Sequence, residues 1–89
     1  MDAAKLKKLE DYASTLGKKG AEEEKNREYG EAIPTYLKLV DVLLVMSEVS
    51  PSYSHWVKCT TNAENYQKKI QLLIHQARLQ NEKQHAPTL

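Results

Sequence analysis

Residues 31–49 read EAIPTYLKLVDVLLVMSEV, and this stretch decides the fold. Apolar side chains recur at helical spacing on nearly every side of it, and after the first turn only Lys38, Asp41 and Glu48 carry charge. A helix that is apolar nearly all round has to be covered on several sides. We therefore expect a central helix over Glu31–Val49 that packs between other helices and leaves some apolar surface for a partner.

The segment Asn26–Gly30 separates this helix from the residues before it. Gly30 is predicted to be the N-cap of the central helix, because glycine is accepted at that position. Pro34 is predicted to lie near the edge of the first turn, where it loses at most one backbone hydrogen bond. Pro34 therefore marks a helix start and does not argue against a helix.

A first helix is predicted over Asp2–Lys25, with Asp2 as its N-cap. Its apolar stripe, at spacings of three and four, consists of Leu6, Leu9, Ala13, Leu16 and Gly20. Gly17 and Gly20 each cost about 1 kcal/mol relative to alanine inside a helix. Two interpretations follow: close packing against another helix, or a groove with Gly17 as its floor.

Ser50–Ser52 forms the second break, because Pro51 ends the helix before it. A third helix is predicted to begin near Ser52 or Ser54. Its nearly strict three–four repeat consists of Trp56, Thr60, Ala63, Tyr66, Ile70, Leu73 and Ala77. The polar segment from Gln80 to Leu89 resembles a linker, so the domain is expected to span residues 1–80 and the linker 81–89. Three helices with short connections predict an all-α, antiparallel three-helix bundle.

The composition favours one small domain without a nucleic-acid function. The chain has 89 residues and a net charge of +1, whereas nucleic-acid-binding domains are usually strongly basic. A single cysteine excludes an internal disulfide bond, no run reaches the ~18 apolar residues of a membrane span, and no secretory signal is recognisable. We expect a cytoplasmic protein.

The sequence offers no recognisable catalytic or metal-binding constellation. His55, His75 and His85 lie far apart and are expected to be solvated, and no base is recognisable beside Cys59, which is expected to be a buried core thiol. The stretch LGKKG lacks the spacing of a phosphate-binding loop. We expect no catalytic residue, no metal and no cofactor.

The segment AEEEKNREYGEAIPTYLKLV, residues 21–40, resembles the helix–turn–helix corner of MIT (microtubule interacting and trafficking) domains. The shared features are an acidic run, Tyr29, the Glu31-Ala32-Ile33 triplet and Tyr36. Tetratricopeptide repeats have the same corner, but no second match follows about 34 residues later. In NYQKKIQLL, residues 65–73, Tyr66, Lys69 and Leu73 match the third-helix pattern of MIT domains, whereas Ile70 and Gln71 depart from it.

The resemblance implies a three-helix module at the start of an AAA ATPase that remodels ESCRT-III filaments in membrane scission or cell division, with the archaeal Cdv ATPases the most similar. Such modules bind short C-terminal motifs of ESCRT-III subunits. One motif type is a helix that lies between the second and third helices. The other is an extended, proline-containing strand between the first and third.

Two sets of candidate peptide-binding residues follow. The groove between the first and third helices is expected to involve Leu9, Ala13, Gly17, Ile70 and Ile74. The groove between the second and third is expected to involve Val40, Leu43, Met46, Lys69 and Leu73. The glycines favour the former and the surplus of apolar residues in the central helix favours the latter.

The expected partner is a short linear motif of an ESCRT-III-like protein, with any membrane contact made through that partner. The isolated domain is expected to be monomeric and the full-length protein oligomeric. Two alternatives remain open: a tetratricopeptide-like structural adaptor, and a bundle that dimerises through its second helix.

Overall fold

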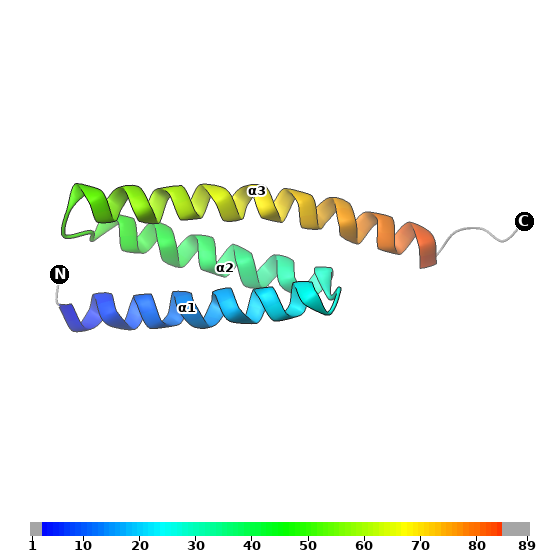
Figure 1. The fold of residues 1–89 in the computed structure, drawn as a ribbon, viewed down its shortest axis with the longest axis horizontal. Helices are drawn as coiled ribbons and strands as arrows, with labels where there is room; N and C mark the ends of the chain where they lie inside the picture. The colour runs from blue at the N-terminus through cyan, green and yellow to red at the C-terminus, as the bar shows by residue number, and fades with distance from the viewer. Residues whose placement is uncertain (1–2, 85–89) are drawn as a thin grey trace, which may run out of the picture.

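Three α-helices joined by two short turns make up the protein, of which the computed structural model describes residues 3–84. α1 spans Ala3–Lys25, α2 spans Tyr29–Glu48 and α3 spans Tyr53–Gln84. The helices lie side by side with α2 in the middle, and each runs antiparallel to the one before it (Figure 1). The predicted all-α, antiparallel three-helix bundle is therefore confirmed.

The bundle is flat and elongated, with principal extents of 61 × 19 × 15 Å. α1 and α3 each pack on α2, but no described Cα atom of α1 lies within 8 Å of one in α3. α3 continues well beyond the turn that joins α1 to α2 (Figure 1). Side chains of α2 therefore line the space between the two outer helices.

The start of α2 differs from the prediction. Its N-cap is Glu28, whose carbonyl accepts hydrogen bonds from the N–H groups of Glu31 and Ala32, at 3.1 and 2.9 Å. Gly30 is consequently inside the first turn and is not the cap. Pro34 lies two residues further in than expected, within the helix. Its missing N–H deprives the carbonyl of the exposed Gly30 of a helical partner, which water can replace.

A tight motif ends α1. The Glu28 N–H donates to the Glu23 carbonyl at 2.8 Å and the Arg27 N–H donates to the Glu24 carbonyl at 3.0 Å. Arg27 has φ 60°, so the pattern is that of a Schellman motif, with an arginine at the position usually taken by glycine. Gln80 Nε2 donates to the Arg27 carbonyl at 3.1 Å, which ties α3 to this turn.

The other predicted boundaries agree within a few residues, with one larger difference at the end of α3. The linker was expected from residue 81, but α3 continues to Gln84. No glycine or proline occurs there before Pro87, so nothing in the chain stops the helix earlier. Asp2, the expected cap of α1, and residues 85–89 lie outside the described residues.

The core follows the whole inner surface of α2. Tyr36, Leu39, Val40, Leu43 and Met46 are all buried there. The outer helices cover them with a second set of buried residues, Leu16 of α1 and Cys59, Ala63, Ile70 and Leu73 of α3. The predicted burial of Cys59 is thus confirmed. No helix within residues 3–84 combines the length and apolar character needed to cross a membrane.

One close approach sets the distance between α1 and α2. A Cβ atom added to Gly20 would lie 2.6 Å from Cε1 of the Tyr36 ring, closer than real Cβ contacts come. A Cβ atom on Gly17 would meet only Tyr66 Oη at 3.8 Å and Leu39 Cδ2 at 3.9 Å, which is ordinary van der Waals contact. The packing interpretation therefore applies to Gly20, whereas a methyl group at Gly17 would fit without overlap.

We predict opposite effects of alanine at these two glycines. Gly17→Ala should stabilise the fold by up to about 1 kcal/mol, because alanine is the better helix former. Gly20→Ala should destabilise it by about 1–3 kcal/mol, because the buried Tyr36 ring would have to move. Urea unfolding followed by circular dichroism measures both, and a Gly20→Ala variant as stable as Gly17→Ala would contradict the proposed close packing.

Candidate functional site

A groove between α1 and α3, with α2 as its floor, is the main candidate site. Its cavity has a volume of about 410 Å³. The residues that line it are Ala13, Ser14, Gly17, Lys18 and Ala21 of α1, Leu39 and Leu43 of α2, and Asn62 and Tyr66 of α3. The floor is therefore apolar and the α1 wall consists largely of small residues, while polar side chains stand at the rim.

Side-chain contacts connect α1 and α3 beyond each end of this cavity. Lys69 Nζ lies 3.2 Å from Glu24 Oε1 on the side of the α1–α2 turn. Towards the opposite end of the bundle, His55 Nε2 lies 3.9 Å from Glu10 Oε1. Between Ala13 and Ala21, the first and last α1 residues that line the cavity, α1 rises about 12 Å at about 1.5 Å per residue. The cavity is thus long enough for three or four residues of an extended peptide, at about 3.3 Å per residue.

A cluster around Tyr36 forms one end of the groove. The Tyr36 hydroxyl donates to Glu24 Oε1 at 2.9 Å, and Lys69 Nζ lies 5.5 Å from the Tyr36 ring centroid. The rings of Tyr36 and Tyr66 stack with centroids 5.3 Å apart. Burial raises the pKa of Tyr36 above its ordinary value, and the adjacent Glu24 carboxylate adds to this rise. This cluster connects all three helices.

The residues expected in the first–third groove are only partly brought together. Ala13 and Gly17 line the cavity. Leu9 and Ile74 are half-buried side chains packed against the core, and Ile70 is a core residue. The apolar stripe of α3 faces α2 more directly than it faces α1, which explains why Ile70 is buried.

The residues expected in the second–third groove lie elsewhere. Val40, Met46 and Leu73 are buried in the core, and Leu73 is only 1% exposed. Leu43 forms part of the floor between α1 and α3. Lys69 pairs with Glu24 of α1 and so belongs to the same side. None of these five side chains presents an open surface between α2 and α3.

Several groove residues were not identified from the sequence. Ser14, Lys18, Ala21, Leu39, Asn62 and Tyr66 all line the cavity. One usable pattern was the row of small residues Ala13, Gly17 and Ala21, which recur every four positions and share one side of a helix. The spacing of apolar residues could not identify the α3 residues of the groove, because it does not show which side of α3 faces α1 and which faces α2.

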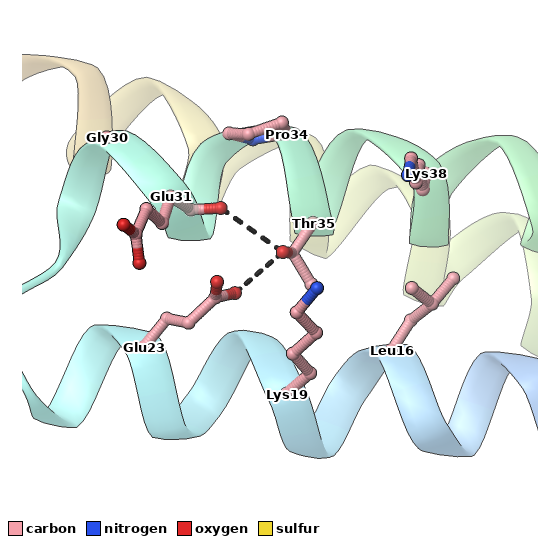
Figure 2. Close-up of a pocket in the computed structure, with 8 residues that line it drawn as sticks. All are labelled: Leu16, Lys19, Glu23, Gly30, Glu31, Pro34, Thr35 and Lys38. Atoms are coloured by element: carbon pink, nitrogen blue, oxygen red, sulfur yellow. Dashed lines mark hydrogen bonds between the residues drawn. The ribbon is translucent and has the colours of Figure 1, made fainter.

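A second cavity, of about 500 Å³, lies between α1 and the first half of α2 (Figure 2). Thr35 Oγ1 is within hydrogen-bond distance of Glu23 Oε1, at 2.6 Å, and of the Glu31 carbonyl, at 3.1 Å. Lys19 and Glu23 extend from α1 towards Thr35 (Figure 2). Since most of its lining side chains are polar or charged and only Leu16 and Pro34 are apolar, this cavity is a poorer candidate for docking an apolar peptide than the α1–α3 groove.

Carboxylates crowd together near this second cavity. A hydrogen bond with Glu28 and the charges of Glu28 and Glu23 raise the pKa of Glu31. Glu31 is exposed, so solvent screens much of this repulsion. The crowding at the start of α2 is favoured in part by the helix dipole, which stabilises negative charge at a helix N-terminus.

A small polar network connects the three helices at the other end. Ser50 Oγ lies 2.7 Å from His55 Nδ1, and Cys59 Sγ lies 3.7 Å from the same nitrogen. Cys59 therefore does have a histidine beside it, contrary to the sequence-based interpretation, and the spacing of four residues along one helix was the missed indication. Burial raises the pKa of the Cys59 thiol, which disfavours the nucleophilic thiolate.

This network lines none of the cavities described above. Ser50 Oγ also donates to the Met46 carbonyl at 3.0 Å, as expected of a residue that caps the end of α2. We interpret the network as a structural link. Within residues 3–84, no cluster of three or more histidine, cysteine, aspartate or glutamate side chains is arranged to hold a metal ion.

Comparison of the chain with models of protein families, with curated proteins and with solved structures found no match. The function therefore has to be argued from the sequence pattern and from the geometry of the groove.

We predict that the Tyr36 cluster makes the fold sensitive to alkaline pH. Because the folded pKa of Tyr36 is raised, the unfolded chain loses this proton first, and stability is lost as pH rises above about 10. Near pH 8, Tyr36→Phe should lower the free energy of unfolding by about 1–2 kcal/mol, because the hydrogen bond to Glu24 is lost. Between about pH 9 and pH 11, the stability of this variant should fall less than that of the unaltered chain.

The matched control for this prediction is Tyr66→Phe, which removes a hydroxyl at the rim of the groove. It should keep most of the alkaline loss of the unaltered chain, because burial of Tyr36 and its bond to Glu24, the larger causes of the raised pKa, remain. Urea unfolding at several pH values measures the effect. Equal alkaline losses in Tyr36→Phe and Tyr66→Phe would show that Tyr36 is not its source.

Proposed function

We propose that this chain is a non-catalytic protein-interaction module that docks short C-terminal motifs of ESCRT-III-like subunits. In this proposal it is an MIT-type domain that recruits an AAA ATPase to remodel or disassemble their filaments, in membrane scission or cell division. The sequence support is the corner at residues 21–40 together with Tyr66, Lys69 and Leu73. The structural observation that carries the proposal is the apolar-floored groove between α1 and α3.

The shape of the groove favours an extended occupant over a helical one. A Cβ atom on Gly17 would already be within 3.8 Å of Tyr66 Oη, so the two walls approach closely over the floor. A helix with its side chains is about 10–12 Å wide and could not reach Leu39 and Leu43 between these walls. An extended chain places alternate side chains on opposite sides and could insert one row of them into the groove.

Weak individual binding fits such a role. The groove is short, so an isolated domain should bind one motif with an affinity around micromolar, or ~8 kcal/mol. If the full-length protein is an oligomer and the subunits form a filament, several domains engage several motifs at once. Avidity then strengthens recruitment without any further contact.

A second candidate function, dimerisation through α2, is favoured by a specific observation. Leu37, Leu44 and Val45 of α2 are 40–49% exposed although they are large apolar side chains. Leu37 and Leu44 are seven residues apart and share one side of the helix. Sedimentation analysis of the chain distinguishes the two functions: a stable dimer that Leu44→Asp converts to monomer would favour this alternative.

The docking proposal predicts that filling the groove abolishes peptide binding. Gly17→Met should weaken binding at least tenfold, because its side chain would occupy the space over Leu39 beside Tyr66. The control is Thr15→Met, an exposed position on α1 that lines neither large cavity. The probes are overlapping peptides that tile the C-terminal regions of ESCRT-III-like subunits, with binding measured by fluorescence anisotropy.

Both variants must first have the helical circular dichroism of the unaltered chain. Equal binding by Gly17→Met and Thr15→Met would contradict docking between α1 and α3. Binding that is lost in Leu37→Asp but kept in Gly17→Met would place the site on the outer side of α2.

A further inference from the structure

We propose that the occupant of the α1–α3 groove is an extended peptide with acidic residues on both sides of a short apolar core. This inference rests on the proposed docking function and adds the charge of the partner. It follows from an imbalance of charge at the rim, where lysines that form no ion pair outnumber carboxylates that form none.

The α3 wall carries almost no negative charge. Asn62 and Tyr66 line the groove. Lys58 lies one turn before Asn62 and Lys69 lies two turns after it, so both belong to the same side of the helix by spacing. Between Lys58 and Gln76 the only carboxylate is Glu64, which lies 3.8 Å from Lys68 on another side of α3.

The α1 wall has a weaker bias, because Glu22, four residues after Lys18 and three before Lys25, is an exposed carboxylate on the same side of the helix. Lys18 lines the groove, and Lys25, seven residues further along, lies on the same side of α1. Both side chains are exposed. No ion pair within the part of the chain that the structure describes involves Lys18, Lys25 or Lys58.

Of the two carboxylates near the ends of the groove, Glu24 is the one held by close contacts. Glu24 Oε1 accepts from both the Tyr36 hydroxyl and Lys69 Nζ. Glu10 Oε1 lies 3.9 Å from His55 Nε2. An incoming basic residue would have to compete with Tyr36 and Lys69 for Glu24, whereas an incoming acidic residue finds Lys18, Lys25 and Lys58 outside any ion pair. Charge complementarity therefore favours an acidic partner.

The floor indicates that the partner is a peptide and not a nucleic acid. Leu39 and Leu43 provide aliphatic surface at the bottom of the groove, and the α1 wall adds Ala13 and Ala21. Apolar side chains of a peptide can be buried there, whereas single-stranded nucleic acid requires aromatic side chains on which successive bases stack. The one aromatic group at the rim, Tyr66, already stacks on Tyr36.

The test uses three fluorescein-labelled peptides with the common core Val-Pro-Leu-Pro-Val. The first peptide has two glutamates on each side of this core, the second has two glutamines on each side, and the third has two lysines on each side. Proline keeps the peptides extended. We expect the glutamate peptide to bind about tenfold more tightly than the glutamine peptide, equivalent to about 1.4 kcal/mol, and the lysine peptide to bind most weakly. The preference should decline as salt is added.

A matched pair of double variants locates the effect. Lys18→Glu with Lys58→Glu should remove or reverse the preference for the glutamate peptide. Lys8→Glu with Lys38→Glu makes the same change in total charge at exposed positions that do not line this groove, and should retain the preference. If the first double variant fails to fold, Lys18→Gln with Lys58→Gln replaces it and should reduce the preference to near one.

The outcomes separate this inference from the docking function. Equal binding of all three peptides, or tighter binding of the lysine peptide, overturns the acidic partner and leaves docking intact. If none of the three peptides binds, both the acidic partner and the docking of an extended peptide in this groove are overturned. Tighter binding of an oligothymidylate that displaces the glutamate peptide would make the occupant a nucleic acid and also overturn the inference.

Discussion

The contact between Gly20 of α1 and the Tyr36 ring of α2 constrains the rest of the molecule. No side chain larger than hydrogen fits at Gly20 while Tyr36 keeps its position, and Tyr36 is only 1% exposed. The ring also stacks on Tyr66, and its hydroxyl binds Glu24, which in turn binds Lys69. One aromatic side chain thus sets the positions of both outer helices relative to α2 at this level of the bundle.

The groove is a consequence of this arrangement. Because α2 holds both outer helices, α1 and α3 do not need to approach each other, and Tyr66 stands between them with its hydroxyl close to Gly17. Gly17 and Gly20, three residues apart, have different roles: one allows contact and the other leaves a gap. The apolar surface of α2 that neither outer helix covers becomes the floor, through Leu39 and Leu43.

The helices could be predicted because their apolar repeats are long and because Pro51 ends the second of them clearly. The start of α2 was placed two residues too late, because the Schellman motif at Arg27 lets the chain reverse without glycine. Of the residues expected in the groove between the first and third helices, Ala13 and Gly17 line the cavity. Leu43 and Lys69 were expected between α2 and α3 but lie on the side that faces α1. The helical repeat shows which residues share a face of a helix, but it does not show which neighbouring helix that face meets. Lys58 and Asn62 needed the three-dimensional packing.

The attachment of α1 has a consequence for local opening. Among the described residues, α1 has Cα atoms within 8 Å of those of α2 but not of α3. Most buried core residues belong to α2 and α3, so α1 can detach while these two helices stay packed together. Amide hydrogens of α1 would then exchange through an opening smaller than global unfolding. A groove occupant touches α1 and α3 together and binds only the closed form, so it adds RT ln(1 + [L]/Kd) to the free energy of this opening. Ligand binding and the detachment of α1 are therefore thermodynamically linked: the ligand lowers the fraction of molecules in which α1 is detached.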